Sequence, residues 1–141
     1  MPEITPGTAP ENPAENPTAD ATADPVDLGE LIPEWLDWKA AGNALGVSVT
    51  KVRTWIREHH LAAAVPRPGA GQQVPAELIM DGEIVKGVPG LLTIFHDGGY
   101  DDREILEWMF TPDDSLPGRP IDALRENRGS EVKRRAQAMS L

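Results

Sequence analysis

The stretch WKAAGNALGVSVTKVRTWIREHHL, residues 38–61, decides the fold of this chain. Its first part is rich in Ala and Leu, which favour a short helix. Gly46 follows at a point where a helix ends and the backbone often takes a positive φ, which glycine adopts at little cost. Ser48, or Thr50 if the next helix starts two residues later, offers a hydroxyl to the free N–H groups of a helix start. The stretch therefore predicts two short helices joined by a tight turn.

The second predicted helix, about residues 49–59, has two different faces when its residues are placed at about 100° per residue. The face predicted to pack inward carries Val49, Val52, Trp55 and Ile56. The opposite face carries Thr50, Arg53, Thr54 and Arg57, with Lys51 and Glu58 at its margin. Arginine offers a two-pronged donor to guanine edges, and hydroxyls or lysine reach phosphates and bases. This face suits the major groove of double-stranded DNA, although a solvated basic face would give the same pattern.

The segment LAAAVPRPGAGQQVP, residues 61–75, reads as a strand, a loose Pro/Gly turn and a second strand. Such a hairpin is a candidate wing with Arg67 near its tip, or a simple hairpin that caps the core. The words LGVS and VRTWIRE resemble the helix-turn-helix of excisionase- and MerR-type winged-helix proteins, where similar words continue into a wing. The candidate DNA-binding residues are Ser48, Thr50, Lys51, Arg53, Thr54, Arg57 and Arg67.

Charge is distributed unevenly along the chain. The net charge is −10, which by itself argues against a nucleic-acid partner. However, residues 38–75 carry +4, while residues 1–37 carry −9, residues 76–114 carry −8 and residues 115–141 carry +3. The basic segment coincides with the predicted helix-turn-helix, and this coincidence supports DNA binding.

The first 27 residues are predicted to be a disordered acidic tail, because they contain six prolines and almost no large apolar residues. Thr5, Thr8, Thr18 and Thr22 lie in an acidic context that a Ser/Thr kinase can reach, and we select Thr8 among them as the candidate. A phosphate would add about −1.5 to −2 charge and should compete with DNA for the basic segment. Alternatively, threonine is merely common in such tails.

The rest of the chain predicts further helices. Asp81-Gly82 is a two-residue hairpin signal between short strands. Helices are then expected after Pro89, Asp101 and Pro120, and Ser130 is expected to cap the last one. The predicted fold class is mainly α with a small β wing. A winged helix-turn-helix at residues 28–80 is followed by a C-terminal helical bundle at residues 81–141.

Two further resemblances lie in this C-terminal half. The words EWMFTPDDSL and GRPIDAL resemble the toxin-binding domain of Xre-type antitoxins. VPGLLTIFHDGGYDD, taken with the helix-turn-helix, resembles a small actinobacterial family of winged-helix DNA-binding proteins, described as regulatory and as candidate targets of a receptor-type Ser/Thr kinase. The resemblance implies a transcriptional regulator. The alternative is an antitoxin or adaptor that binds a protein partner, or itself, through the C-terminal half.

Other classes of function lack support in the sequence. Asp97, Asp101, Asp102, Asp113 and Asp114 do not alternate as the ligands of a calcium loop do, and no phosphate-binding glycine loop or catalytic triad is evident. His96 is far along the chain from His59 and His60, so we expect neither a metal site nor a cofactor. Without cysteine, a membrane-spanning run or a secretory signal, we expect a non-enzymatic protein of the cytoplasm or nucleoid.

Overall fold

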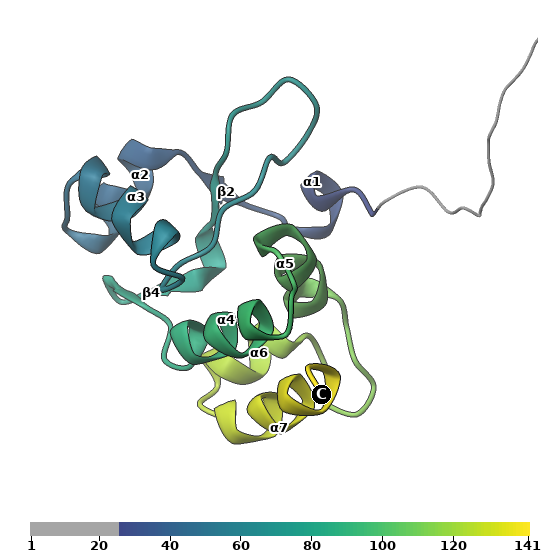
Figure 1. Cartoon of the computed structure of the whole chain (residues 1–141). Coiled ribbons are helices and arrows are strands. Elements are labelled where there is room, and N and C mark those ends of the chain that lie inside the picture. The colour runs from purple at the N-terminus through teal and green to yellow at the C-terminus, as the bar shows by residue number, and fades with distance from the viewer. Residues whose placement is uncertain (1–25) are drawn as a thin grey trace, which may run out of the picture.

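Helices dominate the chain in a computed structural model that describes residues 26–141 (Figure 1). The α-helices are α1 (Leu28–Leu31), α2 (Trp38–Leu45), α3 (Val49–Arg57), α4 (Val88–Asp97), α5 (Asp102–Phe110), α6 (Pro120–Arg125) and α7 (Gly129–Met139). The short strands are β2 (Trp35–Leu36), β3 (Val74–Pro75), β4 (Ile79–Met80) and β5 (Glu83–Ile84), with a 3-10 turn η1 (Ala76–Leu78) before β4. The predicted class, mainly α with a small β wing, is confirmed.

The helix-turn-helix forms as its sequence predicts. Asp37 caps α2 by accepting a hydrogen bond from the Ala40 N–H at 2.8 Å, and Gly46 ends that helix with a φ of 71°. Ser48, rather than Thr50, caps α3, since its Oγ accepts from the Lys51 N–H at 3.1 Å. Gly42 allows the turn to approach α2, because a Cβ there would lie 2.7 Å from the Val47 carbonyl oxygen.

The wing contains less strand than predicted. β2 pairs antiparallel with β3, and residues 61–75 add one isolated bridge, in which Ala64 and Gln73 exchange backbone hydrogen bonds of 3.0 and 2.9 Å. The continuous strand predicted from Leu61 is therefore wrong. Residues 61–64 are buried in the core instead, and the loop beyond them projects away from the helices (Figure 1).

The helices of the C-terminal half lie where the turn, proline and capping residues predict them. β4 and β5 pair antiparallel around Asp81-Gly82. The predicted capping box of α5 is present, with the Asp101 carboxylate accepting from Glu104 N–H and the Glu104 carboxylate from Asp101 N–H. Ser130 was expected to cap α7, but that helix begins at Gly129 and has no side-chain cap. The helix therefore begins two residues earlier than a cap at Ser130 would place it.

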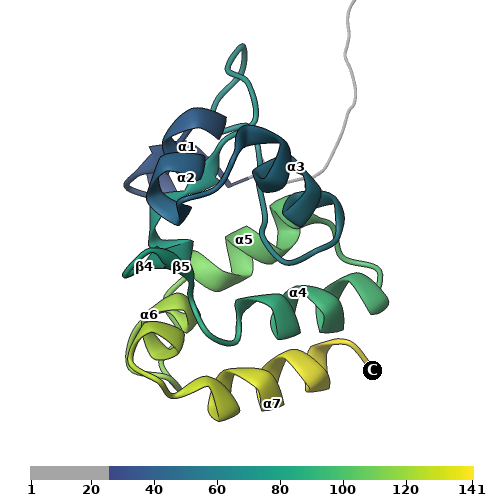
Figure 2. The ribbon, with the colours of Figure 1, turned by 90° about the vertical axis from the view of Figure 1, so that its left-hand side faces the viewer.

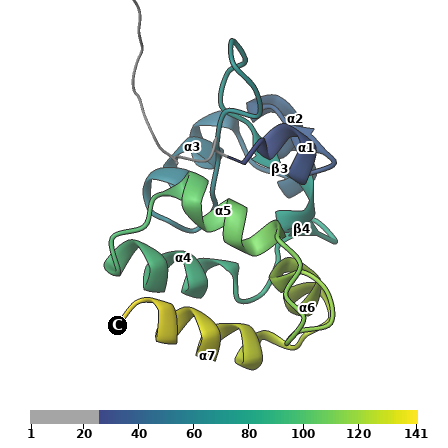
Figure 3. The ribbon, with the colours of Figure 1, turned by 90° about the vertical axis from the view of Figure 1, so that its right-hand side faces the viewer.

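One hydrophobic core joins the two halves. Figures 2 and 3 show α2 and α3 stacked over α4 and α5, with α6 and α7 on the far side. Val52 of α3 is fully buried in the same cluster as Leu92 of α4 and Leu106 of α5. Val49, predicted to face inward, is 38% exposed. It lies in the first turn, and its side chain leans toward the helix start and away from the core.

Candidate nucleic-acid interface

The polar face of α3 is open to solvent. Arg53 and Arg57 are exposed, as are Lys51, Thr50 and the capping residue Ser48. Thr54 is half-buried and is the least exposed residue of the predicted set. Helix α3 ends at Arg57, two residues before the predicted end of about residue 59. The structure therefore brings the predicted residues of this helix onto one accessible surface.

Two side-chain contacts orient the cations of α3. The Arg57 guanidinium donates a hydrogen bond to the Thr54 hydroxyl at 3.2 Å. The Lys51 ammonium lies 5.2 Å from the centroid of the Trp55 ring, a cation–π distance. The half-buried indole thus packs one edge on the core and offers its face to a lysine. Both contacts restrict the cationic side chains without neutralising their charge.

The cations of α3 and the wing lack acidic partners within the described residues. No carboxylate lies within 4.0 Å of Lys51, Arg53, Arg57 or Arg67 across residues 26–141. Three arginines of the C-terminal half, Arg103, Arg119 and Arg128, each form an ion pair with a nearby carboxylate. A polyanion would therefore meet uncompensated charge on α3 and the wing.

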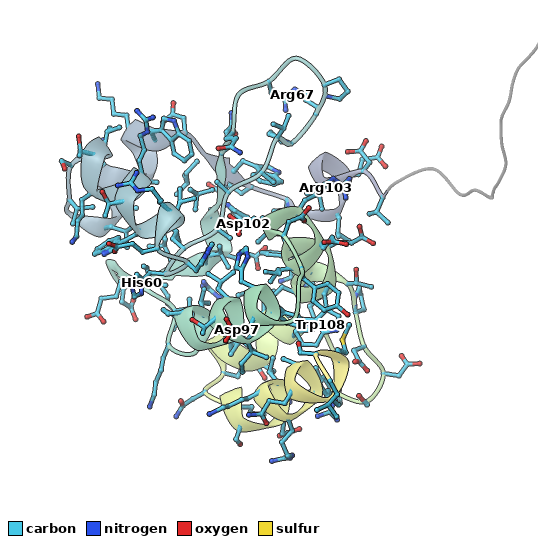
Figure 4. All side chains as sticks on the ribbon, viewed as in Figure 1. His60, Arg67, Asp97, Asp102, Arg103 and Trp108 are labelled. Carbon is cyan, nitrogen blue, oxygen red and sulfur yellow. The ribbon has the colours of Figure 1, made fainter. Side chains whose placement is uncertain are left out.

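The wing carries Arg67 on a loop whose first residues pack against the rest of the protein. Pro66 is buried, and its carbonyl oxygen lies where a Cβ on Gly29 would be only 2.6 Å away, so α1 packs closely under the loop. The Ala70 N–H donates to the Arg67 carbonyl at 3.1 Å and closes a turn at the tip. Figure 4 shows Arg67 on this projecting loop, away from α4 and α7. Its exposed guanidinium is available to a phosphate.

Helix α2 adds a cation that the helical wheel of α3 did not reveal. Lys39, in the first turn of α2, is exposed. The charge count of residues 38–75 included it, but only the three-dimensional fold shows that it belongs to the outer surface of the helix-turn-helix. We therefore add Lys39 to the candidate phosphate contacts.

Two other sequence predictions concern regions beyond this interface. Thr8, the candidate phosphorylation site, lies outside the described residues. Among the helices from residue 26 onward, none has the length and apolar character needed to span a bilayer.

Comparisons with known proteins match both halves of the chain. Residues 27–79 match the winged helix-turn-helix domain of DNA-binding protein Rv2175c, and residues 85–140 match the Rv2175c C-terminal domain of unknown function. The DNA-binding protein Rv2175c of Mycobacterium tuberculosis (strain ATCC 25618 / H37Rv) is 44% identical over 117 residues, which cover 74% of this chain and 79% of that protein.

A solved structure agrees with this relationship. The NMR structure of Rv2175c superposes with a TM-score of 0.70 at 43% sequence identity, covering 77% of this chain and 82% of that one. The chain therefore belongs to the Rv2175c family of winged helix-turn-helix proteins.

Proposed function

We propose that this protein binds double-stranded DNA, with α3 in the major groove and Arg67 on the flanking backbone. The observation that carries the proposal is the exposed set of cations on α3, opposite the buried Val52, with no carboxylate of residues 26–141 paired to them. Helix-turn-helix proteins place such a helix against base edges while the rest of the module contacts phosphates. The relative in M. tuberculosis, named a DNA-binding protein, supports the same assignment.

The proposal extends to transcriptional regulation. Arg53 and Arg57 are the side chains suited to base edges, since a guanidinium donates two hydrogen bonds to the O6 and N7 of guanine. Selection of binding sites from random duplexes, at a low and a physiological ionic strength, tests this proposal. Enrichment of one sequence at both salt concentrations supports a regulator. Binding without enrichment would mean that the protein binds DNA non-specifically, and would contradict sequence-specific regulation.

Removing Arg67 should weaken binding to all duplexes to a similar degree. If Arg67 neutralises one phosphate, Arg67→Ala lowers affinity by about three- to tenfold and reduces the slope of log K against log salt by about 1. Fluorescence anisotropy over a salt series measures both quantities. Gln72→Ala, at an exposed uncharged position of the same loop, is the matched control. An unchanged salt slope in Arg67→Ala would remove the wing from the interface.

Phosphorylation of the N-terminal tail is proposed as a control of this binding, with Thr8 as the candidate residue. The support is its sequence context: the tail is already acidic, and a phosphate adds further charge that competes with DNA for the cations of α3. Thr8→Glu should therefore lower duplex affinity relative to Thr8→Ala in the same anisotropy assay. Equal affinities of the two variants would argue against control at this site.

A protein partner bound through the C-terminal half is the second candidate function. An open groove between α4, α5 and the end of α7 is lined by aromatic and apolar side chains, among them Tyr100, Trp108 and Met139. Such a surface suits a protein segment or a second copy of the chain. Two results together would favour this function over DNA binding. A stable protein partner that contacts Trp108 would co-purify with this protein, and the protein itself would show no affinity for duplex DNA at low salt.

A further inference from the structure

Two histidines and an aspartate meet where the helix-turn-helix contacts the C-terminal half. The rings of His59 and His96 stack with their centroids 3.7 Å apart, and His96 Nε2 lies 2.7 Å from Asp102 Oδ1. One ligand atom from each residue falls within 4.8 Å of the other two. His96 is far from His59 along the chain, but the fold brings α4 against the end of α3 and places the two rings in contact.

We propose that His59, His96 and Asp102 bind one divalent transition-metal ion of the Zn²⁺ type. Two imidazoles and a carboxylate form a donor set that suits zinc, and the absence of cysteine restricts the site to nitrogen and oxygen ligands. Zinc–ligand distances of about 2.0–2.2 Å put tetrahedral ligand atoms roughly 3.4 Å apart. An ion would therefore replace the direct contact of 2.7 Å between His96 Nε2 and Asp102 Oδ1, and these two atoms would move slightly apart to bind it. The stacked rings, inclined by 23°, have to hinge apart to direct one nitrogen each at the ion. Water completes the coordination.

The carboxylate of this site is held in place before any ion arrives. Asp102 Oδ2 accepts a hydrogen bond from the Ala63 N–H at 3.3 Å, which leaves Oδ1 directed at His96. The side chains of His96 and Asp102 are only 19% and 20% exposed. Such a fixed outer contact orients a ligating carboxylate and lowers the entropy lost when a metal binds.

The backbone places His59 at a position where histidine has a cost. His59 has a φ of 62°, and the turn that ends α3 holds it there: the His59 N–H donates to the Ile56 carbonyl at 3.1 Å and the His60 N–H to the Trp55 carbonyl at 2.8 Å. This Schellman arrangement favours glycine or asparagine at the left-handed residue. Backbone preference alone does not explain a histidine at this position. A role as a metal ligand does explain it, because neither glycine nor asparagine supplies an imidazole.

The electrostatic surroundings favour a cation. His59 follows the C-terminal end of α3, and His96 lies one residue before the end of α4, so two negative helix ends converge here. Figure 4 shows Asp102 where α5 approaches the helix-turn-helix. The positive N-terminus of α5 opposes this effect only at Asp102.

A bound ion would link the end of α3 to the C-terminal half. The three ligands come from the turn after α3, from the last turn of α4 and from the first residue of α5. Coordination would therefore limit the movement of the recognition helix relative to α4 and α5. This role does not depend on DNA and is measured without it.

Titration of the full, chelator-treated chain with Zn²⁺ tests the site. We expect one ion per chain by calorimetry, and a rise in Tm of about 5 °C or more when free Zn²⁺ exceeds its Kd about a hundredfold. In ¹⁵N-labelled protein, amide shifts should concentrate at residues 58–64 and 95–103. The absence of heat and of any Tm shift in the wild-type chain would overturn the proposal.

The variants separate ligation from packing. His59→Asn keeps a residue that tolerates the left-handed backbone but removes the imidazole, and His96→Gln removes the second ring; both should lose the Zn²⁺-induced Tm shift. His60→Asn is the control, because His60 is exposed, outside the three-residue cluster and nearest to Glu58. Circular dichroism without metal verifies that each variant folds. An unaltered Zn²⁺ response in His59→Asn, or its loss in His60→Asn, would contradict the assignment.

Discussion

The double substitution Arg53→Ala with Arg57→Ala is expected to lower duplex affinity by about 100-fold or more, since each guanidinium contact to a base or phosphate contributes about 1–3 kcal/mol. Both side chains are exposed, and neither has an acidic partner among the described residues. Their removal leaves no buried charge or cavity behind. Stability should therefore change little, with Tm within about 2 °C of the wild-type value.

Removal of two positive charges elsewhere is the control for this experiment. Lys133 and Arg134 are exposed on α7, so Lys133→Ala with Arg134→Ala changes the net charge equally. If α3 is the recognition helix, this control keeps affinity within about threefold of wild type, as expected for a screened, long-range effect. Equal losses from the two double variants would mean that overall charge, rather than the face of α3, drives binding. Anisotropy with one duplex at fixed salt compares them directly.

The parts of the fold that were predictable depend on local chemistry. Gly46 ends α2 and Ser48 begins α3 because a positive φ and a hydroxyl cap are properties of single residues. The capping box at Asp101 and Glu104 likewise needs only a spacing of three. These signals do not depend on the rest of the structure, so they can be read directly from the sequence.

The parts that were not predictable depend on tertiary packing. Whether Val49 is buried depends on how far the core extends beneath the first turn of α3. A helical wheel shows which side of the helix a residue is on, but not where along the helix the core ends. The extended segment before Ala64 lacks a strand partner for most of its length, although its composition suits a strand. The contact of His59 with His96 joins residues 37 positions apart, and no periodic pattern reports it.

The candidate interface was partly predictable for the same reasons. The helical period places Arg53 and Arg57 on one face, and the structure leaves that face exposed. Sequence alone did not distinguish these cations from those of residues 115–141, since residues 38–75 and residues 115–141 both carry a net positive charge. The structure shows a difference for Arg119, which forms ion pairs of 2.6 Å with Glu77 and with Asp122, whereas Arg53 has no carboxylate within 4.0 Å among residues 26–141.

Arg119→Met is expected to destabilise the fold by about 2–3 kcal/mol, because it leaves two half-buried carboxylates without their cation. The guanidinium donates to both oxygens of Glu77 at 3.1 and 2.6 Å, and to both oxygens of Asp122 at 2.9 and 2.6 Å. Arg119 is 22% exposed and Glu77 is 23% exposed, so solvent screens the pair only partly. Methionine keeps the aliphatic packing near Phe110, whose ring centroid lies 5.4 Å from the guanidinium carbon.

This destabilisation should depend on pH with a definite sign. The hydrogen bonds from Arg119 lower the pKa of the Asp122 carboxyl below its ordinary value of 3.8. A carboxyl with a lowered folded-state pKa stabilises the protein fully above the pKa of the unfolded chain, and this contribution is lost as pH falls through the folded-state value. The difference in unfolding free energy between wild type and Arg119→Met should therefore be largest at neutral pH and shrink below about pH 4.

Urea unfolding at neutral and acidic pH, followed by circular dichroism, measures this difference. Arg103→Met is the comparison, because Arg103 and Glu107 are 41% and 38% exposed and pair across a single helical turn. Such an exposed pair contributes about 0.5 kcal/mol or less. If Arg119→Met costs no more than Arg103→Met, the contact between η1 and α6 does not hold the two halves together. The shared core of Val52, Leu92 and Leu106 would then carry that role alone.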